Sequence, residues 1–152
     1  MKARVPGALT QFLRPYDRSI RDLALALRST VLDELAPCHE NIYDAYSAVA
    51  IGYGTSDRLS DGIVHLAVYA KHVNLGFNEG VALPDPGHLL IGKGSQVRHL
   101  TVRTRDDLER PEIRAFLRAA RQEAGKAAPP KRGPRPVVST VKRIYARKRR
   151  PR

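Results

Sequence analysis

The stretch that decides the fold is Asp61-Gly-Ile-Val-His-Leu-Ala-Val-Tyr-Ala-Lys-His-Val-Asn-Leu-Gly-Phe77. It contains two runs rich in β-branched and aromatic residues, 62–70 and 73–77, which meet at Lys71 and His72. Such residues are enriched in β-strands. Two strand-like runs with a short connection favour an antiparallel hairpin. We therefore expect a β-hairpin with Lys71 and His72 at its tip.

Three further strands are expected outside the hairpin. Residues 41–46 and 48–53 precede it and are rich in the same residue types. Residues 96–103 follow it and alternate, with Val97, His99 and Thr101 on one face. The segment between, 78–95, is rich in glycine and proline, which predicts a loop with at most a short helical turn at 88–91.

Two helices are expected, one before and one after these strands. The first covers residues 17–36, where Asp17 is a candidate N-cap and Pro37 ends the run. In the second, Pro111 is well placed in the first turn. The apolar stripes are Ile20, Leu23, Ala24, Leu27, Val31 and Leu35 in the first helix and Ile113, Phe116, Leu117 and Ala120 in the second. The order of elements predicts an α+β two-layer sandwich, in which an antiparallel sheet of four to five strands carries two main helices on one face.

The sequence resembles the YdhG-like family of small bacterial domains over roughly residues 15–122. The resemblance rests on residues 61–77, on Leu89-Leu-Ile-Gly-Lys-Gly94 and on Val97-Arg-His-Leu-Thr-Val102. Its most specific parts are the Lys71-His72 hairpin before a strand ending in Gly76-Phe77, and the later Gly-Lys followed by an arginine-containing strand. The resemblance implies an α+β domain whose function is mostly unknown. One branch of the family is frataxin-like in fold and has been proposed to handle iron.

Charge divides the chain into two parts. The net charge is +12, and eleven of the 27 basic residues lie after residue 124, where no acidic residue occurs. Residues 1–124 are nearly neutral and long enough for one domain with a core. Residues 125–152 are basic and contain proline and glycine, so we expect a tail that is disordered or conditionally helical. In such a helix the apolar face would be Val137, Val138, Val141, Ile144 and Tyr145.

Cysteine content and hydropathy favour a cytoplasmic protein. Cys38 is the single cysteine and cannot form an internal disulfide, and no apolar run of signal-peptide length follows Met1. The longest apolar stretches fall far short of the roughly 20 residues that a membrane-spanning helix requires. We expect no transmembrane segment.

Candidate residues for binding a small ligand lie in two places. Gly92-Lys93-Gly94-Ser95 and Arg98 could form an anion pocket, because glycines let backbone amides approach an anion. The alternative to an anion pocket is an ordinary glycine-rich turn whose cations are solvated. The nearby aromatic residues could wall a small pocket, although aromatic residues at strand spacing usually belong to a core; they are Tyr43, Tyr46, Tyr53, Tyr69 and Phe77. The ligand-binding candidates are Lys71, His72, Lys93, Arg98, Tyr46 and Tyr69.

Candidate residues for binding a polyanion lie on the second helix and the tail. Like charges three and four residues apart on a helix repel, so the arginine stripe there requires either an external polyanion or acids from another element. The candidates are Arg114, Arg118, Arg121, Lys131, Arg132, Lys142, Arg143, Arg147, Lys148, Arg149 and Arg150. Such contacts would carry little sequence selectivity.

Metal-binding and catalytic patterns are weak. Asp22 and Asp33 share a helix face but are roughly 16 Å apart, so they cannot share an ion. The histidines lack metal-ligand spacing, and hydrogen bonding near the core is the commoner role for His65 and His99. Cys38 is adjacent to His39, but neighbouring residues seldom point at each other. We predict neither a catalytic centre nor a metal site, and the cofactor stays unknown.

The function expected from the sequence is that of a non-enzymatic domain that binds a small ligand or a protein partner, a second copy included. The first alternative is a nucleic-acid-associated protein that contacts the phosphate backbone through the tail and last helix. The second alternative is a frataxin-like iron-binding chaperone, which the basic composition disfavours.

Overall fold

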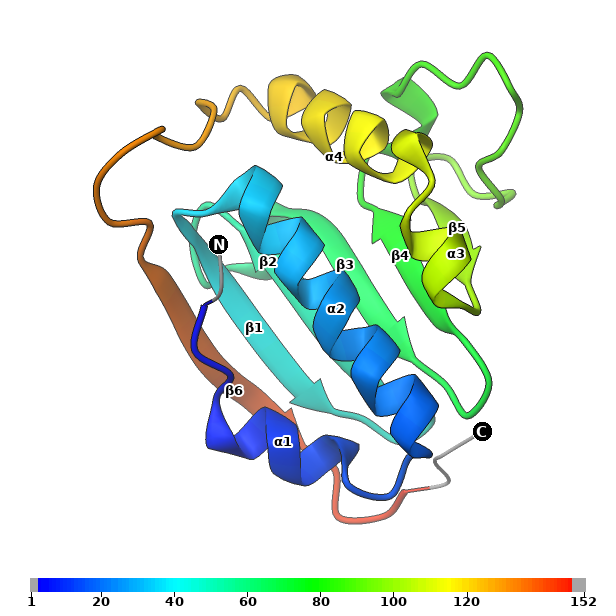
Figure 1. Ribbon diagram of the computed structural model, residues 1–152, viewed down its shortest axis with the longest axis vertical. Coiled ribbons are helices and arrows are strands. Elements are labelled where there is room, and N and C mark those ends of the chain that lie inside the picture. The colour runs from blue at the N-terminus through cyan, green and yellow to red at the C-terminus, as the bar shows by residue number, and fades with distance from the viewer. Residues whose placement is uncertain (1–2, 149–152) are drawn as a thin grey trace.

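The computed structural model describes residues 3–148 as one six-stranded sheet with helices packed on one of its faces (Figure 1). The strands are β1 Cys38–Asp44, β2 Val49–Gly54, β3 Gly62–Val68, β4 Val73–Phe77, β5 Arg98–Val102 and β6 Val137–Ile144. The helices are α1 Gly7–Leu13, α2 Arg18–Leu35, α3 Arg105–Leu108 and α4 Pro111–Glu123, with single 3-10 turns at Leu59–Asp61 and Gly80–Ala82.

The strand order is β5-β4-β3-β2-β1-β6. All neighbours are antiparallel except β1 and β6, which run parallel. The sheet is therefore mixed, and the expectation of an antiparallel sheet is wrong for this pair. The expected hairpin is confirmed: β3 pairs with β4, and the Tyr69 amide donates to the His72 carbonyl at 2.9 Å. Ala70 and Lys71 are therefore the central residues of the turn, so the expected tip at Lys71 and His72 is wrong by one residue.

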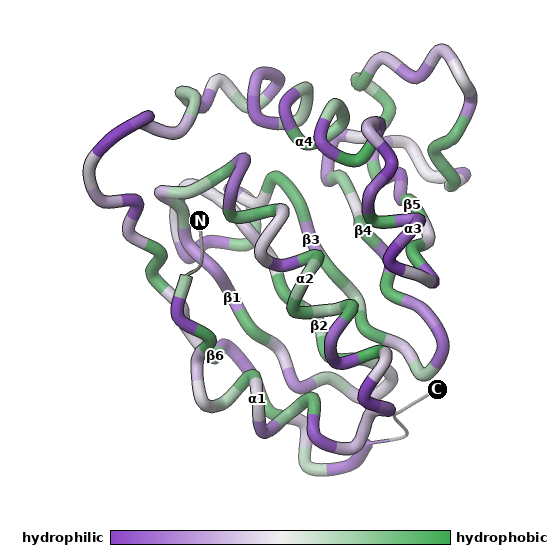
Figure 2. Tube along the Cα trace, viewed as in Figure 1, coloured by the Kyte–Doolittle hydropathy of each residue, from purple (hydrophilic) through white to green (hydrophobic). Residues whose placement is uncertain are grey.

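Both expected helices are confirmed, and two short ones accompany them. Helix α2 begins after Asp17, and its last cap residue precedes Pro37. Helix α4 begins at Pro111. Helix α1 was not predicted, although its buried residues Leu9, Phe12 and Leu13 have helical spacing. Figure 2 shows hydrophobic and hydrophilic residues alternating along α2 and α4, as expected of helices with one buried side.

The core lies between the helices and one face of the sheet. Residues from α1, α2, α3 and α4 join a single buried cluster. Its members from the strands include Ile42, Val49, Ile51, Tyr53, Val64, Leu66, Val68, Val73, Leu75, Phe77 and Val102. Most of these occupy alternate strand positions, which point to the same face. The residues between them point to the opposite face, which none of the helices within residues 3–148 covers (Figure 1). We call it the open face.

A buried ion pair joins α2 to three strands. The Arg28 guanidinium donates to both carboxylate oxygens of Glu40, at 2.7 and 3.0 Å, and the Tyr53 hydroxyl donates at 2.9 Å. The Ser139 hydroxyl on β6 donates to the same carboxylate at 2.7 Å. Burial would lower the pKa of Arg28, but the hydrogen bonds and charge of Glu40 outweigh it and raise that pKa. Burial and then the charge of Glu40 raise the pKa of Tyr53.

The expectation of a disordered or conditionally helical tail is wrong for residues 137–144. They form β6, whose register with β1 runs from Cys38 opposite Val137 to Asp44 opposite Ile144. The segment Val-Val-Ser-Thr-Val is rich in β-branched residues, which favour a strand over a helix. Without β6, β1 would be an open edge with unpaired backbone groups. The sheet therefore has six strands rather than four or five.

Residues 78–95 form the expected loop, without a helical turn at 88–91. The loop between β4 and β5 contains its 3-10 turn at residues 80–82 instead. The Asp85 carboxylate accepts from the amides of Leu89 and Leu90 at 2.8 and 2.9 Å. Ile91 then pairs with His99 through two backbone hydrogen bonds. These local side-chain bonds compete with helix formation.

Within residues 3–148, the structure contains no helix that is long and apolar enough to cross a membrane.

Candidate binding site on the open face of the sheet

The open face carries a row in which polar residues alternate with glycines. Residues that are paired across neighbouring strands point to the same face. From β6 to β5 the row is Thr140, Asn41, Gly52, His65, Gly76 and His99. Because glycines have no side chain, this row places hollows between its polar groups.

A cavity of about 220 Å³ lies over the β1–β3 part of this row. Asn41, Tyr43, Gly52 and His65 line it from the strands. The loop 55–61 closes one side, where Ser56 and Arg58 belong to the lining. The cavity is smaller than the roughly 300–1,000 Å³ typical of drug-sized ligand sites. Its size suits a compact group such as a single ring.

Gly52 and Gly76 have different roles in shaping this cavity. At Gly52 nothing lies within 4 Å of the place that a Cβ would take, so the floor is open. At Gly76 a Cβ would overlap the His65 imidazole. The His65 ring therefore lies over Gly76, where its Nδ1 is 2.9 Å from the Asn78 Oδ1. This position of His65 leaves the space above Gly52 free.

Asn41, which lines the cavity, has a buried polar atom without a hydrogen-bond partner among the described residues. The side chain is only 6% exposed, and its Nδ2 donates to the Asp57 carbonyl at 3.2 Å. Its Oδ1 is buried and, among the residues that the structure describes, has no hydrogen-bond partner. Leaving a buried acceptor unpaired costs about 1–3 kcal/mol. A ligand with an N–H or O–H group would remove that cost.

The electrostatics of the open face favour neutral or anionic ligands. Within 3–148 no strand position pointing to this face carries an acidic residue. The nearest acids belong to the loop 55–61, where Asp57 pairs with Lys142 at 3.6 Å and Asp61 accepts from Ser56 at 2.6 Å. Burial, followed by the charge of His65, lowers the pKa of His99. His99 is accordingly neutral at pH 7.

Four of the predicted ligand residues lie together at one end of the sheet. Tyr46 belongs to the β1–β2 turn, while Tyr69, Lys71 and His72 belong to the β3–β4 turn beside it. The Tyr69 and His72 rings stack with centroids 5.0 Å apart. Burial and the charge of Arg103 lower the pKa of His72. The group is a surface cluster, and none of these residues lines the open-face cavity.

The other two predicted ligand residues, Lys93 and Arg98, lie toward the opposite end of the sheet, where Arg98 pairs with Phe77. The Arg98 guanidinium donates to the carbonyls of Gly94 and Val97 at 2.6 and 2.8 Å. Lys93 is exposed. Arg98 therefore holds its own loop, and the geometry matches the glycine-rich turn better than the anion pocket.

The predicted arginine stripe on α4 is compensated by acids of α2. Glu34 accepts from Arg114 at 3.2 Å and from Arg118 at 3.0 Å, and lies 3.8 Å from Arg121. Asp33 pairs with Arg114 at 3.3 Å. The repulsion among the α4 arginines is therefore relieved by acids of another element, which was one of the two expected possibilities beside an external polyanion. The ion pair with Arg114 also occupies Asp33, one of the two acids considered as metal ligands in the sequence.

Of the tail cations predicted to bind a polyanion, some have partners in the structure and others are exposed. Lys142 pairs with Asp57, Lys148 pairs with Asp44 at 2.9 Å, and the Arg143 guanidinium lies 4.5 Å from the centroid of the Tyr145 ring. The remaining described candidates, Lys131, Arg132 and Arg147, are exposed. Arg149 and Arg150 lie outside the described residues.

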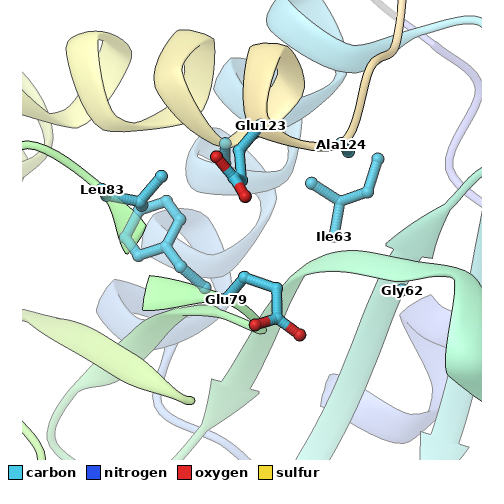
Figure 3. A pocket seen from close by; sticks show the side chains of 8 residues that line it. Gly62, Ile63, Glu79, Leu83, Glu123 and Ala124 are labelled. Atoms are coloured by element: carbon cyan, nitrogen blue, oxygen red, sulfur yellow. The ribbon is translucent and has the colours of Figure 1, made fainter. Parts of the chain in front are cut away.

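A second cavity lies between α4 and the start of β3 and is less suited to a ligand. It measures about 80 Å³, and its apolar lining includes Ile63 and Leu83. Figure 3 shows the carboxylates of Glu79 and Glu123 beside it. Both side chains belong to exposed residues. Among the described residues that line it, none has a buried polar atom without a partner.

The structure gives Cys38 the properties of an inert thiol. Burial, followed by the charge of Glu40, raises its pKa to about 12. In the described part of the chain, no three His, Cys, Asp or Glu side chains converge so that they could hold a metal ion.

We expect the native Cys38 thiol to react with a chromogenic aromatic disulfide at pH 8 on the order of a thousandfold more slowly than in urea-unfolded protein, because only the thiolate attacks. Stopped-flow absorbance on native and unfolded samples measures both rates. Equal rates in the two samples would contradict a buried, un-ionised thiol.

Asn41 and Gly52 were not singled out from the sequence. The available signals were a glycine inside an apolar strand, which often marks a close approach of a ligand, and the alternation of Asn41 and Tyr43 with Ile42. Of the aromatic residues proposed to wall a pocket, Tyr53 and Phe77 belong to the core, and Tyr43 and Tyr53 belong to the lining of the cavity.

The chain was compared with family models, curated proteins and solved structures, and none of the three comparisons found a match. The resemblance to the YdhG-like family stays a prediction.

Proposed function

We propose that this protein is a binding domain that holds a small polar molecule in the open-face cavity and performs no chemistry on it. The observation that carries this proposal is the Asn41 Oδ1, a buried acceptor without a partner at the wall of a cavity. Buried polar groups in proteins are nearly always paired, and exceptions point to function or to a missing partner. A bound ligand supplies that partner.

The lining defines the ligand. The ligand donates a hydrogen bond through an N–H or O–H group, because the free group on Asn41 is an acceptor. It is compact and flat on one side, because the floor at Gly52 has no side chain and the cavity is small. Tyr43 offers an aromatic surface beside it. Such a ligand is a ring with amino or amide groups.

Binding without catalysis is supported by the states of the reactive side chains. The pKa of Cys38 is raised, so its thiol is protonated at neutral pH. The His65 Nδ1 is engaged with Asn78, and its ring covers Gly76 rather than the cavity floor. Neither side chain is placed as the activated nucleophile or the free base that covalent or acid–base catalysis requires.

The test is a thermal-shift screen with nucleosides, free nucleobases, amino-acid amides and sugars. A ligand present at 100 times its dissociation constant stabilises the native state by about 2.7 kcal/mol, which raises the melting temperature. Gly52→Val fills the floor and is expected to abolish the shift. The matched control is Gly94→Val, which also has open space at the Cβ position but lies outside the cavity. A shift that persists in Gly52→Val would exclude this cavity as the site.

A further inference from the structure

We propose that the open-face cavity takes one base of a single-stranded nucleic acid, whose neighbouring phosphates contact Lys142 and Arg143 on β6. This inference rests on the proposed function and specifies its ligand. The cavity supplies the contact to the base, and the tail strand supplies the contacts to the backbone. Both belong to the same face of the sheet.

The position of β6 brings its cations beside the cavity. β6 is the neighbour of β1, and Arg143 pairs with Tyr43, which lines the cavity. Neighbouring strands are about 4.8 Å apart, so Arg143 borders the lining. Lys142 lies near the cavity as well, because its ion-pair partner Asp57 also accepts a hydrogen bond from Asn41, a lining residue. Arg58 lines the cavity from the loop 55–61.

Charge complementarity selects a polyanion as the occupant of this face. Its strand positions carry no acidic residue within the described range. On the helix side, by contrast, Asp33 and Glu34 already neutralise arginines of α4. The pair of Lys142 with Asp57 is loose and exposed, and such surface pairs contribute little, so a phosphate can replace Asp57. Arg143 lies over the Tyr145 ring and, among residues 3–148, its side chain has no hydrogen-bond or ion-pair partner, so its donors can bind phosphate.

The cavity selects single strands over duplexes. A base can enter it only after it leaves the stack, and proteins that recognise single strands use unstacked bases in this way. The free acceptor of Asn41 suits all bases, because each offers an N–H donor on its edge. Tyr43 provides a surface for base stacking, which tolerates any sequence. We therefore expect a clear preference for single strands and, because the cavity suits a single ring, tighter binding of oligo(C) and oligo(U) than of oligo(A).

The experiment is fluorescence anisotropy of labelled single-stranded oligo(A), oligo(C) and oligo(U), and of a duplex of equal length, with the full chain at several salt concentrations. Single strands are expected to bind more tightly than the duplex. Lys142→Ala combined with Arg143→Ala removes two phosphate contacts and lowers the slope of log affinity against log salt by about 1.4. The charge-matched control is Arg18→Ala combined with Arg105→Ala, two exposed cations of the helix side, which is expected to leave binding unchanged.

Variants of the cavity separate the base contact from the phosphate contacts. Gly52→Val is expected to weaken single-strand binding tenfold or more with the salt slope unchanged, and Asn41→Leu is a second variant with the same expected result. Circular dichroism checks that each variant is folded.

Three outcomes would overturn the inference: equal affinity for duplex and single strands, an equal loss in the helix-side control, or undiminished binding by both cavity variants. The inference fails and the proposed function stands if nucleosides raise the melting temperature, but single strands bind no more tightly than nucleosides and their binding does not depend on salt.

Discussion

Replacing Arg28 with methionine is expected to lower the free energy of unfolding by about 3–5 kcal/mol, because it leaves the buried Glu40 carboxylate without its counter-charge. Glu40 is fully buried and Arg28 is 3% exposed. The Tyr53 and Ser139 hydroxyls would stay as hydrogen-bond donors but supply no positive charge. Urea unfolding followed by circular dichroism measures the loss.

The control for this prediction is Arg18→Met on the same helix. Arg18 lies 3.8 Å from Asp22 in a pair that is mostly exposed, and exposed pairs contribute roughly 0–1 kcal/mol. Combining Arg28→Met with Glu40→Leu is expected to cost less than the two single losses added together, because no charge is left buried. An Arg28→Met protein as stable as the parent would show that Glu40 is not charged in the native state.

Replacing Glu34 with alanine is expected to lower the free energy of unfolding by about 2–3 kcal/mol, since it removes the carboxylate that three arginines share. Arg121 is 8% exposed and retains only its bond to the Glu34 carbonyl, at 2.9 Å. Arg114 and Arg118 are more exposed, so the loss of their ion pairs with Glu34 lowers the free energy of unfolding by less. Thermal and urea unfolding measure the change.

The matched control is Asp33→Ala, because Asp33 pairs with Arg114, whose side chain is 43% exposed. That variant is expected to lose under about 1 kcal/mol. Glu34→Ala also uncovers Arg114 and Arg118, so it is expected to gain affinity for a nonspecific polyanion such as heparin. Equal stability of the two variants would show that Glu34 does not organise the stripe.

The elements predicted correctly are those whose signal is local. In α2 the apolar spacing, Asp17 at the start and Pro37 at the end all lie within the segment. The β3–β4 hairpin likewise depends on two adjacent runs and their turn. Such patterns determine local structure because few distant contacts compete with them.

The features that the sequence did not reveal depend on residues far apart in the chain. The acids that compensate the α4 arginines lie about eighty positions earlier, at Asp33 and Glu34. β6 pairs with the edge of β1, and its mixed apolar and basic pattern was interpreted as an amphipathic helix although its β-branched residues favour a strand. The cavity depends on Asn41, Gly52 and His65 from three different strands, whose side-by-side placement follows only from the register.

The pairing of β6 with β1 also has a consequence for biosynthesis. Ribosomes make the chain from the N-terminus, so β1 and its antiparallel partner β2 emerge long before residues 137–144. Until then the outer edge of β1 has no partner, and Glu40 lacks the hydrogen bond from Ser139. Open edges and long-range pairings slow folding and invite association with other chains. The nascent protein therefore depends on its last strand to close both the edge and the buried charge.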